Sequence, residues 1–300
     1  MSSTSHQWVF AMRLSSLAFN VLMTVFFYTC STHAHAQGLA VVVDVTGGVT
    51  FSMPGQGGGQ TKPVMLLDYL QENAKLELKP DARLQLVYLQ TSKTWQFAGP
   101  GEYTLLSALP KVNKGSPAKP ATGGAQAGQS LAAIEPSHRE RIALGAVVMR
   151  SSDSLRLTGP IDEPVLGPSP TLVWEGGGTF RVRVLKADGG VLIAETQTDA
   201  LQWRVPKPLP PGRYEWRVES SGQTEGTPGK SSFFEVLANS NPKRKLLGGG
   251  PPKDGPGTFG DRVVYAARLE HAGLTHEALL QWRKLAAERP DDPALKAWAR

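Results

Sequence analysis

The first 36 residues constrain this chain most, because they decide in which compartment the remainder folds. Arg13 precedes an apolar run from Leu17 to Tyr28, and the polar stretch after it ends in Ala34-His35-Ala36. A positive start, a hydrophobic segment of about a dozen residues and an Ala-x-Ala site are typical of a secretory signal peptide. The run is shorter than the ~20 apolar residues of a spanning helix. We predict a signal peptide over residues 1–36; an uncleaved signal would leave a membrane anchor.

The chain has one cysteine, Cys30, inside this segment. Lipidation there is an alternative, although Tyr28-Thr29 differs from the small residues that precede lipidation sites. Met12 is an alternative start, because Met12-Arg13 is a more usual beginning for a signal peptide. Residues 37–300 contain no cysteine, so we expect no disulfide and no cysteine metal site. Buried apolar surface alone must then hold the fold together.

The balance of basic and acidic residues limits the classes of partner that the chain could bind. Arg13 is the only Lys or Arg in residues 1–36, which lack Asp and Glu, so residues 37–300 carry 31 basic and 26 acidic side chains. This mild excess suits a protein among anionic polymers and lipid headgroups. It is too diffuse for a nucleic-acid-binding surface. The one basic cluster, Lys243-Arg244-Lys245, lies in a predicted linker, so we expect no nucleic-acid partner.

Residues 37–110 have the pattern of a small β-domain. Leu39–Val45 is rich in β-branched residues, Gly47-Gly48 turns the chain, and Leu84–Leu89 alternates between two faces. The domain resembles the FecR domain of bacterial envelope proteins. This resemblance rests on four segments, Val43–Val49, Asp68–Leu78, Asp81–Leu86 and Gly99–Leu105. It implies a β-rich, non-catalytic module outside the inner membrane, and hence a periplasmic protein.

Residues 111–135 change character, with Lys, Pro, Ala, Gly and Gln and almost no large apolar side chain. Such a stretch buries too little surface to offset its ordering entropy, so we predict a disordered linker. The apolar run Ile142–Met149 follows. It either opens the next domain, which we place at residues 136–238, or adds a last strand to the first.

Residues 136–238 have the pattern of a second sandwich. Asp188-Gly189 predicts a hairpin turn, and Arg213–Glu219 alternates as a half-buried strand does. The order of Pro170–Trp174 and Leu209–Trp216 resembles fibronectin type III and related immunoglobulin-like domains, and Trp174 corresponds to their early core tryptophan. A glycan-stacking platform of Trp174, Trp203 and Trp216 is the alternative, but their register with apolar neighbours favours a core.

A second linker, residues 239–257, precedes a helical tail at residues 258–300. Gly273 is a predicted helix end and Thr275 a predicted N-cap. The spacing from Phe259 to Asp292 resembles one tetratricopeptide repeat, in which Arg262 replaces a usual aromatic residue. A single repeat cannot bury its own apolar face. The tail therefore docks on its own chain or binds a partner.

We expect partner binding, because the Gly-rich linker gives the tail reach. Deletion of residues 258–300 should then leave the β-domains equally stable. The partner-binding residues are predicted to be Tyr265, Leu269, Trp282, Leu285 and Trp298.

The sequence shows no motif typical of a catalytic or metal-binding site. His271 and His276 are five residues apart across a helix break, not the four that align two metal ligands, and His138 lies in a polar segment. We expect His271 and His276 to be surface or capping residues. Gly229-Lys230-Ser231 lacks the context of a phosphate loop. Asp162-Glu163, the tightest acidic pair inside a domain, lies in a predicted turn. We predict no catalytic residue, no metal and no cofactor.

The predicted fold is mainly β: a FecR-like β-domain and an immunoglobulin-like sandwich, with a short C-terminal α-helical hairpin. The predicted function is a non-catalytic periplasmic scaffold or binding protein of the cell envelope. Its expected partner is an envelope protein bound through the helical tail and the sandwich edges, and cell-envelope polysaccharide is a further candidate. The alternatives are a FecR-type regulator of envelope signalling and a glycan-binding or glycan-processing protein. The regulator class needs a cytoplasmic domain, and only 16 residues precede Leu17.

Overall fold

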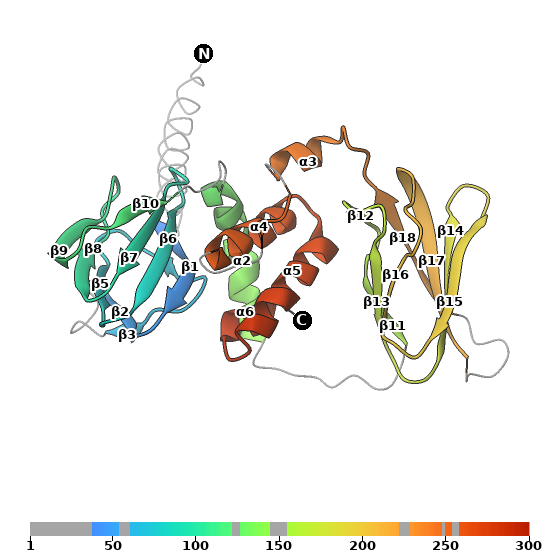
Figure 1. Cartoon of the computed structure of the whole chain (residues 1–300), viewed down its shortest axis with the longest axis horizontal. Coiled ribbons are helices and arrows are strands. Elements are labelled where there is room, and N and C mark those ends of the chain that lie inside the picture. Colours follow the sequence, from blue (N-terminus) through green and yellow to red (C-terminus); the bar gives the residue numbers. More distant parts are fainter. Residues whose placement is uncertain are drawn as a thin grey trace, which may run out of the picture. The chain divides into compact units, whose positions relative to one another are not determined.

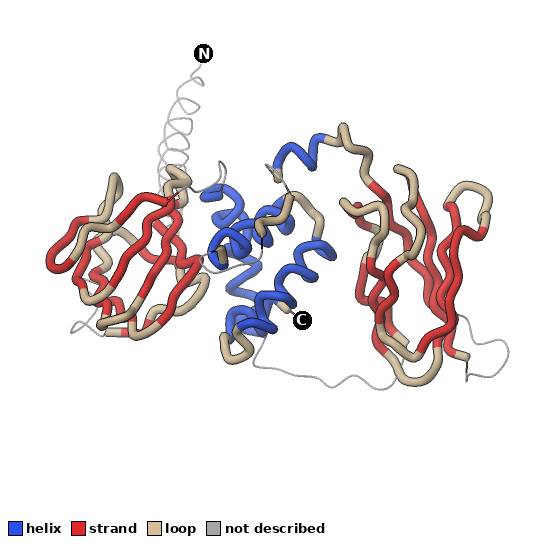
Figure 2. The backbone as a smooth tube through the Cα atoms, viewed as in Figure 1, coloured by secondary structure: helices blue, strands red, loops and turns tan. Residues whose placement is uncertain are grey.

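Strands dominate the computed structural model, which confirms the mainly β fold. The structure describes residues 38–53, 61–121, 127–144, 155–221, 229–247, 250–253 and 258–299. The predicted signal peptide and its cleavage site lie outside these residues. Residues 38–300 group into one unit, in which the helices gather together apart from the strands (Figure 2). None of the described helices combines the length and the hydropathy that crossing a membrane requires.

The first β-domain consists of two five-stranded sheets (Figure 1). The first sheet has the order β10 (Lys119–Ala121), β7 (Thr94–Ala98), β6 (Arg83–Tyr88), β1 (Ala40–Thr46), β4 (Tyr69–Leu70). The second has the order β3 (Lys62–Pro63), β2 (Val49–Ser52), β5 (Lys75–Leu78), β8 (Gly101–Thr104), β9 (Lys111–Gly115). Strand β6 contributes Leu84, Leu86 and Tyr88 to a core of residues from both sheets. Its alternate residues face away from that core.

Ordered elements fill most of the stretch that was predicted to be a disordered linker, so that prediction was wrong. Residues 111–135 contain β9, β10 and the start of helix α2 (Ala127–Leu144). Strand β9 pairs with β8 and strand β10 with β7. These edge pairings are backbone hydrogen bonds, which need no large apolar side chain. The predicted start of the sandwich at residue 136 was also wrong, because α2 runs through it.

The second β-domain is a sandwich of a three-stranded and a five-stranded sheet. The smaller sheet has the order β11 (Arg156–Gly159), β13 (Thr171–Glu175), β16 (Gln202–Arg204). The larger has the order β12 (Glu163–Val165), β18 (Lys230–Val236), β17 (Gly212–Ser220), β14 (Phe180–Lys186), β15 (Leu192–Thr198). The chain changes sheets between β15 and β16, as in immunoglobulin-like folds.

Two local features match this architecture. Near the start of β17, the hydroxyl of Tyr214 donates to the carbonyl of Pro210 at 2.8 Å, which is the geometry of a tyrosine corner. Trp174 and Trp216 are fully buried in the sandwich core, and half-buried Trp203 packs against it. The core interpretation of Trp174 and Trp216 is confirmed, and these two rings offer no platform to a glycan.

The tail forms helices α4 (Phe259–His271), α5 (Thr275–Glu288) and α6 (Pro293–Trp298). Gly273 has φ 68° between α4 and α5, a conformation that favours glycine and confirms the predicted helix end. Asp292 caps α6, since its Oδ1 accepts the backbone N–H of Leu295 at 3.0 Å. The predicted linker 239–257 is partly ordered, because helix α3 (Pro242–Leu246) lies within it.

The tail docks on its own chain. Its helices and α2 share a core with Val41, Val43, Val87 and Leu89, the outward-facing apolar residues of the first sheet and the segment after β6. This corrects the expectation of an exposed tail. The five residues predicted to bind a partner are buried in that core, at relative exposures of 6, 1, 0, 1 and 0%: Tyr265, Leu269, Trp282, Leu285 and Trp298.

Helix α5 also contacts the sandwich. Glu163 at the start of β12 accepts the backbone N–H of His276 at 2.9 Å and the hydroxyl of Thr275. Thr275 was predicted to cap α5, but this carboxylate from the sandwich serves that end of the helix instead. In return, Glu277 accepts the backbone N–H of Leu166 at 3.0 Å. Side chains about 110 residues apart thus fix the start of α5 to β12.

Candidate binding groove

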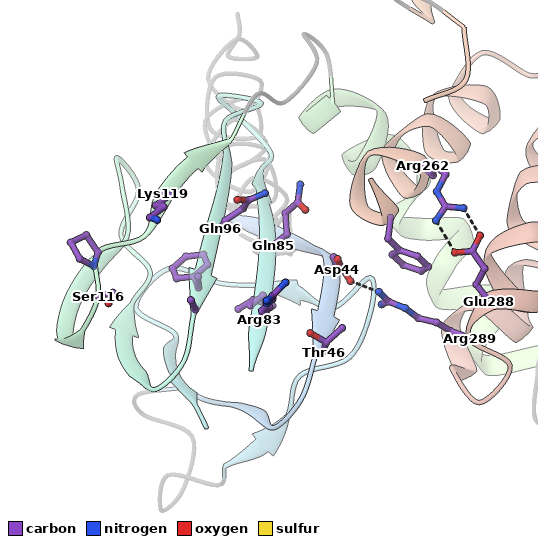
Figure 3. A pocket seen from close by; sticks show the side chains of 15 residues that line it. Asp44, Thr46, Arg83, Gln85, Gln96, Ser116, Lys119, Arg262, Glu288 and Arg289 are labelled. Atoms are coloured by element: carbon purple, nitrogen blue, oxygen red, sulfur yellow. Dashed lines mark hydrogen bonds and ion pairs between the residues drawn. The ribbon is translucent and has the colours of Figure 1, made fainter. Parts of the chain in front are cut away.

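A polar groove of about 1020 Å³ lies where the tail helices stop covering the first sheet (Figure 3). Its floor is the outer face of β10, β7, β6 and β1. One wall is formed by Phe259 and Arg262 of α4, Glu288 of α5 and Arg289 directly after α5. On this sheet face Val41 and Val87 lie under the helices, whereas Arg83, Gln96 and Lys119 are exposed.

Strand register places the floor residues in rows. Lys119 pairs with Gln96, Gln96 with Gln85, and Gln85 with Asp44, so one row crosses four strands. Two residues further along the strands, a second row contains Thr46, Arg83 and Ala98. Period-two alternation puts both rows on one face.

Arg289 ties the wall to the floor. Its guanidinium donates to Asp44 Oδ1 at 2.6 Å and to the carbonyl of Val45 at 3.3 Å. The same guanidinium carbon lies 3.4 Å from the ring centroid of Phe259, a cation–π contact. The side chain of Arg289 is therefore held by strand β1 on one side and by the ring of Phe259 on the other.

A second ion pair stiffens the wall. Arg262, 7% exposed, makes two hydrogen bonds to the carboxylate of Glu288, one of them 2.7 Å long. This hydrogen bonding lowers the pKa of Glu288 below its ordinary value. Burial of a guanidinium requires such pairing, since an unpaired buried charge is strongly destabilising.

Gly260 sets the border between the covered and the open parts of the sheet. A Cβ atom built there would lie 2.8 Å from Oε1 of Gln85. The backbone of α4 therefore packs directly against the amide end of the Gln85 side chain. Gln85 is only 8% exposed, while Gln96 on the next strand is exposed.

The groove carries a surplus of positive charge. Its two carboxylates, Asp44 and Glu288, are engaged by Arg289 and Arg262. Arg83 and Lys119 are exposed, and neither has an ion-pair partner among the described residues. These two cations, on strands β6 and β10, are free to meet an anionic group from outside.

The lining offers hydroxyl groups and paired carboxylates. Its hydroxyl groups come from Thr46 and Ser116, and it includes no histidine that could act as their base. Both lining carboxylates belong to ion pairs, so they do not form an acid–base pair. In the described part of the chain, no three His, Cys, Asp or Glu residues gather as a metal site would require. The arrangement is suited to binding.

Two of the histidines are buried, and the burial of His276 is contrary to expectation. Nδ1 of His138, in α2, accepts a hydrogen bond from Nε1 of Trp298 at 2.9 Å. Nε2 of His276 donates to the carbonyl of Thr171 at 2.6 Å, and burial lowers the pKa of His276 below 6.5. His271 is exposed, as expected. Both buried rings join elements distant in sequence and lie outside the groove lining.

Sequence patterns alone did not predict a site at the groove residues Arg83, Gln85, Gln96, Lys119 and Arg289. A signal was present along β6, where polar side chains alternate with buried leucines. That alternation marks a polar face but does not tell whether helices cover it. The wall comes from residues about 200 positions later, which no local pattern connects to β6.

Large exposed apolar residues gather at one other place. In the hairpin that leads from β14 into β15, Val191 and Leu192 are 58 and 51% exposed, and Ile193 is 36% exposed. Strand β15 is the last strand of its sheet and pairs only with β14. The outer backbone groups of β15 are thus unpaired within the sheet.

No protein-family model and no curated protein matches the chain. CopC from Methylosinus trichosporium OB3b is similar at 24% identity over 29% of this chain and 98% of that chain, with a TM-score of 0.22. FN3tt is similar at 16% identity over 27% of this chain and 90% of that chain, with a TM-score of 0.22. A two-domain fibronectin type III segment from chicken tenascin is similar at 11% identity over 62% of this chain and 82% of that chain, with a TM-score of 0.22. At these TM-scores the likenesses carry no conclusion about the chain. The immunoglobulin-like description of residues 155–237 rests on its strand order and tyrosine corner.

Proposed function

We propose that this chain is a non-catalytic binding protein of the bacterial cell envelope, exported to the periplasm, with its ligand in the groove over the first sheet. The observation that carries the proposal is the half-covered sheet face. Helices bury its apolar part and Gln85, while Gln96, Arg83 and Lys119 stay open beside a wall held by ion pairs. A rigid concave site with a few placed polar groups is the usual form of a ligand site.

The envelope location is supported by the sequence. The signal-peptide pattern and the resemblance of residues 37–110 to FecR domains both favour it. The resemblance of residues 259–292 to one tetratricopeptide repeat is compatible with the same protein, because α2 and the first sheet cover the apolar face that such a repeat exposes. Sequencing of the exported chain should give an N-terminus at Gln37. Recovery of the intact N-terminus from the membrane fraction would contradict export as a soluble protein.

Site-specific photocrosslinking tests the groove. A photoreactive phenylalanine analogue replaces exposed Gln96 on the groove floor, and the chain is irradiated in cells that export it. The matched control carries the same analogue at Ala108, an exposed loop position of the same β-domain that does not line the groove. Adducts from position 96 and not from position 108 are expected. Equal adducts from both, or none from position 96, would contradict the proposal.

A second candidate function is protein binding at the edge of the sandwich. The unpaired edge of β15 and exposed Val191, Leu192 and Ile193 favour an extended partner segment added as a further strand. Crosslinking from Leu192 to an envelope protein is expected in that case. The exposed residue Leu109, in the first domain, provides the control position. Adducts that form equally from both positions would contradict edge binding.

A further inference from the structure

We propose that the groove ligand is an acidic polysaccharide, bound across the strands so that successive carboxylates meet Arg83 and Lys119. This inference deepens the proposed groove function and rests on it. It concerns one class of ligand: linear glycans that carry carboxylate groups.

The placement of the two unpaired cations argues for a polymer. Arg83 is on β6 and Lys119 is on β10, with β7 between them. Two strand spacings separate the backbones by roughly 10 Å. The two side chains come from opposite sides of Gln96 rather than from one point (Figure 3). A single small anion favours cations that converge on it, whereas a repeating polyanion presents separate carboxylates to separate cations.

The groups between the cations suit sugar hydroxyls. The exposed side-chain amide of Gln96 lies on β7, between the strands that carry Arg83 and Lys119. This amide has both donors and an acceptor, so it can pair with a hydroxyl in either role. Thr46 and Ser116 add hydroxyls at two further points of the lining. Uncharged hydrogen-bonding groups flanked by cations match a chain of hydroxyls that bears intermittent carboxylates.

The lining fits other ligand classes less well. An apolar peptide or a lipid chain needs an open apolar pocket, but Phe97 is 3% exposed and Arg289 covers the ring of Phe259. A nucleic acid requires many neutralised phosphates, and this groove offers two uncompensated cations. The balance of few charges and many hydrogen-bonding groups favours an acidic glycan.

Equilibrium binding to polygalacturonate, a linear polymer of a carboxylated sugar, tests the inference with the exported chain. Its methyl-esterified form provides the matched neutral polymer. Arg83→Gln with Lys119→Gln removes both groove cations. The control pair, Lys62→Gln with Lys75→Gln, removes the same charge from exposed positions on the second sheet. Thermal unfolding of every variant verifies that it folds.

The groove variant is expected to bind polygalacturonate about tenfold more weakly than the natural chain, a change of ~1.4 kcal/mol. The control variant should bind nearly as well as the natural chain, and the esterified polymer should bind weakly to all. Ala98→Trp, which fills the floor from an exposed position, should also abolish binding.

Four results would overturn the inference. Equal binding of the esterified polymer would show that carboxylates are not recognised. Equal losses in the groove and control variants would show that only net charge matters. Crosslinks from position 96 without binding of either polymer would leave the groove function intact and refute the glycan class. Polygalacturonate binding that survives Ala98→Trp would place the glycan outside the groove and contradict this inference. The crosslinking result tests the proposed function separately.

Discussion

Arg289, directly after helix α5, donates to the carboxylate of Asp44 in strand β1 at 2.6 Å, across 245 positions of sequence. Each side chain is about one quarter exposed. The pair lies at the edge of the interface through which the tail covers the first sheet, and it also shapes one wall of the groove. One contact thus serves both the docking of the tail and the geometry of the candidate site.

The first prediction concerns this pair. A double-mutant cycle of Asp44→Asn and Arg289→Gln should give a coupling free energy of ~1 kcal/mol in urea unfolding, because the pair is partly shielded from water. The more exposed pair Lys114–Glu102, with side chains 78 and 53% exposed and 3.9 Å apart, is the control and should couple by less than ~0.5 kcal/mol. Equal coupling in both cycles would contradict a role for the first pair in docking.

The second prediction concerns the tail. Trp282 is fully buried in the core that α5 shares with the first sheet and α2, so Trp282→Ala should cost ~3–5 kcal/mol of unfolding free energy. Trp203→Ala, at a half-buried sandwich position, should cost less. Deletion of residues 258–300 should lower the melting temperature of the first domain, since it exposes Val41 and Val87. An unchanged melting temperature would restore the free-tail interpretation.

The third prediction concerns the docking of helix α2. A Cβ atom at Gly128 would lie 2.1 Å from the carbonyl oxygen of Leu89, a backbone atom that cannot move aside. Gly128→Ala should therefore destabilise the protein, although alanine favours a helix over glycine by ~1 kcal/mol. Ala133→Gly, at an exposed position of the same helix, is the converse control and should cost ~1 kcal/mol. Stabilisation by Gly128→Ala in chemical denaturation would refute the close approach.

The fourth prediction is a pH dependence. Burial lowers the pKa of His276 below its ordinary value of 6.5, so the unfolded chain takes up this proton at higher pH than the folded chain. The resulting stability is fully present above 6.5 and falls as the pH decreases below it. The groups that face the ring are Thr171, Glu163, Glu277 and Arg283.

His276→Gln isolates this contribution, because glutamine retains a donor for the carbonyl of Thr171 but does not titrate. The natural chain should lose more melting temperature between pH 7.5 and 5.5 than the variant does. Parallel losses in the two proteins would show that His276 does not report on the junction between α5 and the sandwich.

Sequence patterns alone predicted the elements whose partners are close along the chain. Alternation in Leu84–Leu89 and Arg213–Glu219 marked strands with one buried face, because a strand repeats its side-chain direction every second residue. Gly273 marked the turn between α4 and α5 for a similarly local reason. These features depend on a few neighbouring residues, so a local sequence pattern is enough to predict them.

Which elements cover those faces depends on contacts between segments far apart in the sequence. Lys111–Gly115 and Lys119–Ala121 became strands because neighbouring edges supplied backbone partners, which no side-chain pattern records. Trp282 and Trp298 became interior because β1 and β6 present apolar residues on both faces and so need a second cover. The groove exists where that cover ends at Gly260 and Arg289. Contacts across more than 160 residues depend on which surfaces bury each other in the folded chain. The periodicity of a segment shows that it has an apolar face but does not show which other segment covers that face.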